Sequence, residues 1–94
     1  MHFTYILYSV TADRYYVGAS SDPEVRVAYH NRGDARSTRA YSDWELVFVQ
    51  PFPTKTEALR FERQLKRAKS IKTLQRCIAD PRNQIDALEG TVGA

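Results

Sequence analysis

Residues 3–20 have the sequence FTYILYSVTADRYYVGAS, and this stretch decides the fold. Its two ends, Phe3–Val10 and Tyr15–Ala19, are rich in β-branched and aromatic residues, which favour strands. Only a short polar turn lies between them, and so short a connection joins antiparallel strands. The stretch therefore predicts a β-hairpin. Gly18 inside the second strand marks a bulge or a close approach to the backbone.

The rest of the chain alternates helix and strand signals. Asp22 can cap a helix that has Pro23 in its first position, and Gly33 is a suitable stop for it. Thr54 and Glu57 fit a capping box at the start of a second helix. We expect helices near 23–31, 55–68 and 70–79, and a third strand at 44–50 closed by Pro51 and Pro53. The order β-β-α-β-α-α predicts an α+β domain with helices packed on a small sheet.

The length and composition limit the class of protein. The chain has 94 residues, 43% of them hydrophobic, which suits one domain with a small core. No apolar run approaches the roughly 18 residues of a membrane-spanning helix, and Met1–Val10 lacks the basic start of a signal peptide. Cys77 is the single cysteine, which excludes an internal disulfide and a cysteine-based zinc site and suits the cytoplasm. We expect a domain at 1–79 and a polar, flexible tail at 80–94.

Positive charge is concentrated late in the chain. The formal net charge is +3, but residues 60–76 contain seven basic residues and one acidic residue. A basic segment on a small domain suggests a polyanionic partner, and nucleic acid is the commonest one. The alternative is a solvated helix face, since lysine and arginine are good helix formers.

Glu62 is an unusual residue in this segment. On a helix it shares a face with Ala58 and Leu65, so its carboxylate lies at the edge of an apolar stripe. A charge in that position must be paired or bound to a cation, because burying it alone costs several kcal/mol. Two alternatives follow: an ion pair with Lys66 or Arg63, or a metal ligand.

Four further residues can carry chemistry. Arg26 and His30 are four apart, so one helix face presents both. They form either a surface pair or a phosphate-binding arginine with a histidine for proton transfer. Tyr5 and Tyr16 lie on the two paired strands, where tyrosines commonly serve in packing.

Taken together, these positions resemble the GIY-YIG nuclease family. The first signature element appears as Phe3-Thr4-Tyr5, which keeps only the tyrosine, and the second as Tyr16-Val17-Gly18. Arg26 follows Tyr16 at the family's spacing of ten, and His30 follows Arg26 by four. Glu62 lies on the helix after the third strand, where the family keeps its metal-binding glutamate. The likeness is strongest to small stand-alone bacterial members.

The resemblance implies a three-stranded antiparallel sheet flanked by helices, and hydrolysis of phosphodiester bonds in DNA with Mg²⁺ or Mn²⁺. Glu62 would hold one metal ion, a Lewis acid. Tyr5 or Tyr16 would activate the attacking water while the other binds the scissile phosphate. Arg26 would neutralise charge on that phosphate, and His30 would support the tyrosine or relay its proton. A tyrosine base needs a pKa below its usual value of about 10, which the metal and Arg26 could supply.

The same resemblance implies a basic surface for single-stranded, branched or duplex DNA in repair or recombination. The expected contacts are Arg36, Arg39, Arg63, Lys66, Lys69 and Lys72. An asparagine that many members carry beyond the glutamate helix is missing at 70–74, and the next asparagine, Asn83, falls in the tail. The alternatives are a catalytically silent nucleic-acid-binding module of the same fold and a protein adaptor using Tyr41 and Trp44. We expect a monomer or weak homodimer.

Overall fold

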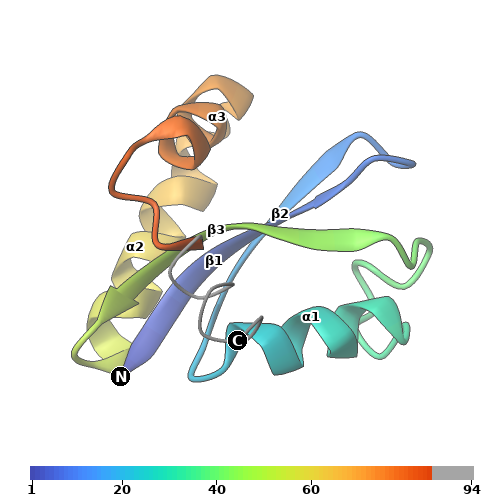
Figure 1. The fold of residues 1–94 in the computed structure, drawn as a ribbon, viewed down its shortest axis with the longest axis horizontal. Helices are drawn as coiled ribbons and strands as arrows, with labels where there is room; N and C mark the ends of the chain where they lie inside the picture. Colours follow the sequence, from blue (N-terminus) through green and yellow to red (C-terminus); the bar gives the residue numbers. More distant parts are fainter. Residues whose placement is uncertain (86–94) are drawn as a thin grey trace.

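Three antiparallel strands form the centre of the computed structural model, which describes residues 1–85. They are β1 (His2–Ser9), β2 (Arg14–Ser20) and β3 (Trp44–Phe52). Their order across the sheet is β2-β1-β3, so the hairpin partner β2 is at one edge and β3 at the other (Figure 1). The predicted hairpin is thus confirmed.

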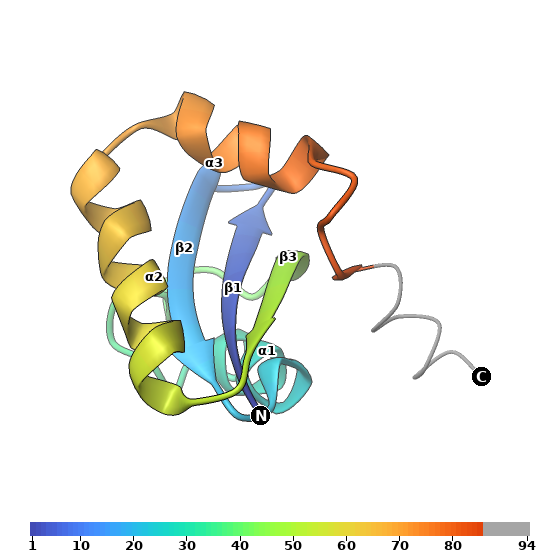
Figure 2. The same ribbon diagram turned by 90° about the vertical axis from the view of Figure 1, so that its left-hand side faces the viewer.

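The helices are α1 (Pro23–Asn31), α2 (Lys55–Ala68) and α3 (Ile71–Ala79), which confirms the order β-β-α-β-α-α and the α+β class. α1 packs on one face of the sheet, and α2 and α3 cover the other face (Figure 2). The side chain of Asp22 accepts a hydrogen bond from the backbone of α1, and Thr54 caps α2 in the same way. No helix within the described part of the chain is long and apolar enough to cross a membrane.

Neighbouring residues of β1 pack into two separate hydrophobic cores, one on each face of the sheet, because successive side chains of a strand point to opposite faces. Tyr5 and Leu7 are buried on the face covered by α1. Ile6 is buried on the other face, against Leu65 of α2. The sheet is therefore covered on both sides.

β3 is longer than the sequence predicts. The prolines were expected to close it after Gln50, but it continues through Pro51 to Phe52. β3 is an edge strand, and an edge strand can hold a proline where no neighbour needs its N–H.

α1 ends two residues before the predicted glycine, which fixes the direction of the following loop. Gly33 has a φ of 81°, a left-handed conformation that favours glycine. Its N–H donates to the carbonyl of His30 at 3.0 Å, and that of Asp34 donates to Tyr29 at 3.3 Å. These two bonds form a Schellman motif at the C-terminus of α1. The motif directs the chain into loop 32–43, which passes beside His30.

The segment after α3 is held on the sheet as far as it is described. Asn83 accepts a hydrogen bond from the Val49 N–H at 3.1 Å and donates to the carbonyls of Val47 and Ile78 at 2.9 and 3.0 Å. Ile85 packs on the α1 face of the sheet. The chain therefore crosses the edge of β3 here, and residues 80–85 belong with the domain. The rest of the expected tail, 86–94, lies outside the described residues.

We predict that Asn83→Ala lowers the free energy of unfolding by about 2 kcal/mol, because two carbonyls and two N–H groups, those of Val49 and Ile85, lose their partner. In a domain of this size the melting temperature should fall by roughly 8–16 °C. Gln84→Ala is the matched control, since its exposed side chain donates only to the carbonyl of Arg82. Equal melting temperatures of the two variants, measured by circular dichroism, would contradict the assigned role of Asn83.

Candidate active site

Tyr5 lies directly over the backbone of Gly18, its partner in the β1–β2 register. A Cβ atom built on Gly18 would stand 2.5 Å from the Tyr5 hydroxyl oxygen and 2.6 Å from Cζ. Real Cβ atoms do not come so close to other atoms, so any larger residue would displace the ring. The close backbone approach expected from the sequence is therefore made by the tyrosine of the first signature element.

His30 joins Tyr5 to the loop after α1. Its Nε2 lies 3.2 Å from the Tyr5 hydroxyl, and its Nδ1 lies 2.8 Å from Thr38 Oγ1. Thr38 in turn donates to the carbonyl of Ala35 at 3.5 Å. Because the Thr38 hydroxyl uses its own proton for Ala35, its oxygen accepts a hydrogen bond from the Nδ1–H of His30. Nε2 of the neutral ring then carries no proton and accepts from the Tyr5 hydroxyl. The His30 side chain is fully buried, so the network fixes its ring.

The position of Thr38 depends on two contacts that the sequence did not reveal. The indole N–H of Trp44 donates to the Thr38 carbonyl at 3.0 Å. The Asn31 side chain accepts from the Trp44 N–H at 2.8 Å and donates to its carbonyl at 3.0 Å. The first bond ties loop 32–43 to β3, and the other two tie β3 to α1. A threonine in a polar loop carries no local signal of such a role.

Arg26 lies one turn before His30 on α1. Its guanidinium carbon is 4.1 Å from the centroid of the Tyr29 ring, a cation–π arrangement. The guanidinium also faces the Tyr5 hydroxyl closely enough to lower the pKa of that group. A fixed positive charge thus lies beside the tyrosine–histidine pair.

Tyr16 also packs against His30, with the two ring centroids 4.6 Å apart. It is half-buried, whereas Tyr5 is only 1% exposed. Ser37, in the loop after α1, faces the Tyr16 hydroxyl and lowers its pKa slightly. The sequence gave no indication of Ser37 either.

Glu62 reaches this group of residues from α2. Its Oε1 is 3.9 Å from Nζ of Lys66, and the same Nζ lies 5.8 Å from the centroid of the Tyr16 ring. The carboxylate is close enough to raise the pKa of both tyrosines. Tyr5, Tyr16, Arg26, His30 and Glu62 therefore converge.

Both tyrosines hold their protons firmly in this environment. Burial raises the pKa of Tyr5 to about 12, although Arg26 acts in the opposite direction. Burial and then Glu62 raise the pKa of Tyr16. Burial and the charge of Arg26 lower the pKa of His30, which favours the neutral ring. Arg26 alone thus does not give either tyrosine the lowered pKa that a tyrosine base requires.

The surroundings of Glu62 fit a divalent cation. The expected pair with Lys66 is present, but 3.9 Å is longer than a hydrogen bond. The Glu62 side chain is 18% exposed, and its oxygens accept no hydrogen bond within residues 1–85. Those residues also hold no cluster of three metal-ligating side chains. Mg²⁺ commonly binds through one or two carboxylates and otherwise keeps water and phosphate oxygens. Glu62 is the carboxylate that suits such an ion.

The predicted DNA-contacting residues differ in how they lie relative to these five side chains. Arg36 and Arg39 are exposed in the loop that supplies Ser37 and Thr38. Lys66 touches the site itself, and Lys69 is the residue that caps the C-terminal end of α2. Arg63 is exposed on α2 and Lys72 in the first turn of α3, with no contact that links them to the five.

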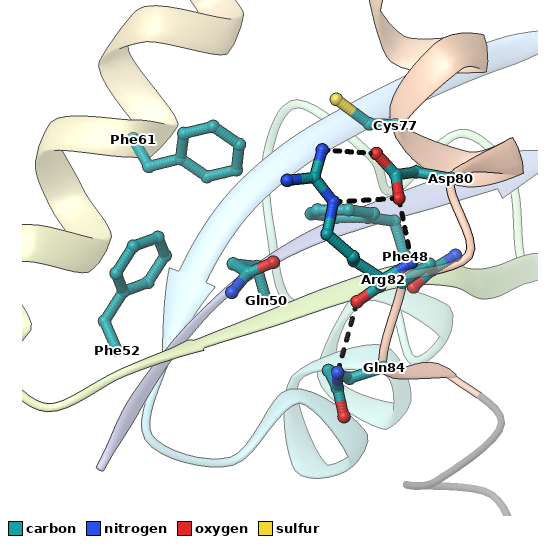
Figure 3. A pocket seen from close by; sticks show the side chains of 9 residues that line it. Phe48, Gln50, Phe52, Phe61, Cys77, Asp80, Arg82 and Gln84 are labelled. Atoms are coloured by element: carbon teal, nitrogen blue, oxygen red, sulfur yellow. Dashed lines mark hydrogen bonds and ion pairs between the residues drawn. The ribbon is translucent and has the colours of Figure 1, made fainter.

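A large hollow lies elsewhere on the described part of the chain. It measures about 640 Å³ and is lined by β3, α2 and α3, with Phe48, Phe52 and Phe61 among its walls (Figure 3). The ion pair between Asp80 and Arg82, 2.8 Å long, lies on its other side. None of the five converging residues lines it, so it is separate from the candidate site.

Comparisons with known proteins identify relatives of the chain. A UPF0213 protein of Halobacterium salinarum is 37% identical over 67 residues, which is 70% of this chain and 86% of that protein. A structure-specific endonuclease subunit SLX1 homolog of Giardia intestinalis is 43% identical over 58 residues, 57% of this chain but only 16% of that protein.

The fold also matches a solved structure. The solution NMR structure of a UPF0213 protein from Bacillus halodurans has a TM-score of 0.51 and 30% identity, over 88% of this chain and 92% of that chain. Finally, the model of the GIY-YIG catalytic domain matches residues 1–75, a span that includes the five converging residues. The chain therefore belongs to the GIY-YIG family, together with small UPF0213 proteins of bacteria and archaea.

Proposed function

We propose that this protein is a divalent-metal-dependent endonuclease that hydrolyses phosphodiester bonds in single-stranded or structured DNA, in repair or recombination. The observation that supports it is the convergence of two tyrosine hydroxyls, an arginine, a neutral histidine and a half-buried glutamate. The name of the Giardia relative, a structure-specific endonuclease subunit, suggests the same class of substrate.

Glu62 would hold one Mg²⁺ or Mn²⁺, which supplies Lewis-acid stabilisation of phosphate oxygens when bound. Arg26 is the protein's own positive charge at the site. Its guanidinium can form two parallel hydrogen bonds with a phosphate, and it is placed before the reaction begins. Charge that develops on the phosphate in the transition state is therefore met by a fixed group.

The two tyrosines have different exposures, and this suggests different roles. Tyr16 is half-buried beside Glu62, so we assign it to the substrate, where its hydroxyl orients the attacking water or the phosphate. The Tyr5 hydroxyl is buried and donates to His30. Tyr5 and His30 are therefore positioning residues that hold α1, and with it Arg26, against the sheet.

A catalytically silent binding module is the alternative. Such a module needs the basic surface but neither Glu62 nor Arg26. Both residues are present and both reach the same site, which favours catalysis.

We predict that Glu62→Gln lowers cleavage in Mg²⁺ by orders of magnitude. Glutamine keeps the shape of the side chain but loses the negative charge that the cation requires. Stability should be unchanged or higher, because a poorly compensated carboxylate is removed. DNA binding should persist. Chelation of the metal from the wild-type protein should have the same effect on cleavage.

Glu45→Gln is the control for this variant, since Glu45 is an exposed carboxylate on β3. Initial rates would be measured on single-stranded, duplex and branched DNA. A purified Glu62→Gln protein that cuts at nearly the wild-type rate would refute the proposed role of Glu62. Metal-independent binding without cleavage by the wild-type protein would select the silent module.

We predict that Tyr16→Phe and Tyr5→Phe separate chemistry from positioning. Tyr16→Phe should lower kcat on the order of 100-fold with little change in melting temperature. Tyr5→Phe leaves the buried Nε2 of His30 without a donor, which should cost about 1–3 kcal/mol of stability. If Tyr5→Phe is inactive but fully stable and Tyr16→Phe is active, the assignments are wrong. Tyr5 would then be the residue that contacts the substrate, and Tyr16 the positioning residue.

We predict that Lys66, Lys69 and Lys72 changed together to glutamate weaken DNA binding and flatten its salt dependence. Each lost phosphate contact should reduce the slope of log K against log salt by about 0.7 to 0.9. Lys55→Glu, at the exposed start of α2, controls for a general change of charge. An unchanged slope in the triple variant would mean that these lysines form a solvated helix face.

A further inference from the structure

A second hollow lies where β2 begins, beside the end of α2 and the start of α3. It measures about 300 Å³. Figure 2 shows the start of β2 beneath the beginning of α3. Val17, Leu65 and Leu74 line the hollow, and all three belong to the core on this face of the sheet. We call it the hairpin groove, and its floor is apolar.

Positive charge borders the hairpin groove on two sides. Arg14 comes from the hairpin, and Lys66 and Lys69 come from the end of α2; all three are exposed. Asp13 is the acidic residue of the lining, and its carboxylate accepts a hydrogen bond from the Tyr8 hydroxyl at 2.7 Å. The excess of positive charge favours a polyanion.

One wall of the hairpin groove is aromatic. Tyr15 is half-buried, and its ring centroid is 4.8 Å from that of Tyr8, its partner in the strand register. Tyr8 thus supports the Tyr15 ring. An aromatic ring beside basic side chains is the combination that binds single-stranded nucleic acid, because any base can stack on the ring while its phosphates meet the charges. The apolar floor suits a base and not a phosphate.

The hairpin groove adjoins the candidate active site through Lys66. This lysine lines the groove, and its Nζ lies 3.9 Å from Glu62 and 5.8 Å from the Tyr16 ring centroid. Tyr15 and Tyr16 are consecutive in β2, so they face opposite sides of the sheet. Because β2 is an edge strand, a polynucleotide can pass around it from one tyrosine to the other.

We propose that the hairpin groove binds an unpaired nucleotide next to the scissile phosphate, with its base on Tyr15 and its flanking phosphates on Arg14 and Lys69. The inference rests on the proposed nuclease function and defines its substrate further. Bases in a duplex have no free face to stack on Tyr15, so the groove selects DNA that is single-stranded beside the cut.

Binding without cleavage tests this proposal. Fluorescence anisotropy in EDTA would compare a single-stranded oligonucleotide, the same strand with abasic positions, and a duplex. For the wild-type protein we expect the abasic strand and the duplex to bind more weakly than the intact strand. Tyr15→Leu should weaken binding of the intact strand roughly tenfold, which is the effect of losing one stacked base. It should then bind the abasic strand and the intact strand alike.

Two comparisons guard against indirect effects. Tyr15→Phe keeps the ring and should bind like the wild-type protein, which excludes a general loss of folding as the cause. Arg14→Gln should weaken binding and reduce the salt slope by about 0.7. Arg60→Gln removes the same charge from an exposed site outside the hairpin groove and should have little effect.

The proposal is overturned if Tyr15→Leu binds the single strand as tightly as the wild-type protein, or if Arg60→Gln weakens binding as much as Arg14→Gln. It is also overturned if the wild-type protein does not bind single strands. The nuclease proposal fails separately, when the wild-type protein cuts no DNA in Mg²⁺ or Mn²⁺ although the groove variants still change binding.

Discussion

The contact between the Tyr5 ring and the backbone of Gly18 is the constraint on which the candidate site depends. It sets where the Tyr5 hydroxyl lies, and that hydroxyl donates to His30. His30 is in turn bonded to Thr38, so one buried network joins β1, α1 and the following loop. A side chain at position 18 would move the tyrosine and with it the position of α1. Since Arg26 is on α1, the placement of the positive charge depends on a glycine in a neighbouring strand.

The edge position of β2 explains how groups from both layers of the protein meet. α1 lies on one face of the sheet and α2 on the other, and a central strand would keep their side chains apart. At the β2 edge no further strand intervenes, and Glu62 and Lys66 of α2 approach Tyr16. The site therefore lies at a sheet edge, which leaves it open to a long, flexible substrate.

Local signals were sufficient to predict the elements of the fold. The helix caps at Asp22 and Thr54 and the stop at Gly33 each act through backbone groups a few residues away, so they can be recognised in the sequence. The roles of Thr38 and Asn83 depend on partners that are distant in the chain or belong to another element. No periodicity or spacing carries such information. This is why the sequence placed Asn83 in a tail, whereas it joins α3 to β3.

The candidate site shows the same difference between what local sequence signals reveal and what only the folded structure determines. Its five residues could be selected by spacing and by resemblance, and the structure brings them together. Their protonation could not be foreseen, because it depends on burial. The resemblance implied that a metal ion and Arg26 together could lower the pKa of a tyrosine. Among the protein's own groups, burial is the largest cause and raises the pKa of both tyrosines.

The raised pKa values of the two tyrosines follow from the same burial that fixes their side chains. Burial fixes Tyr5, and partial burial fixes Tyr16, but removing a hydroxyl from water also disfavours its anion. Glu62 adds to this effect, and Arg26 offsets only part of it. A positive charge beside Glu62 would oppose the carboxylate's influence on Tyr16. The protein's own groups, burial above all, therefore keep both tyrosines protonated, and the fixed arginine offsets only part of that effect.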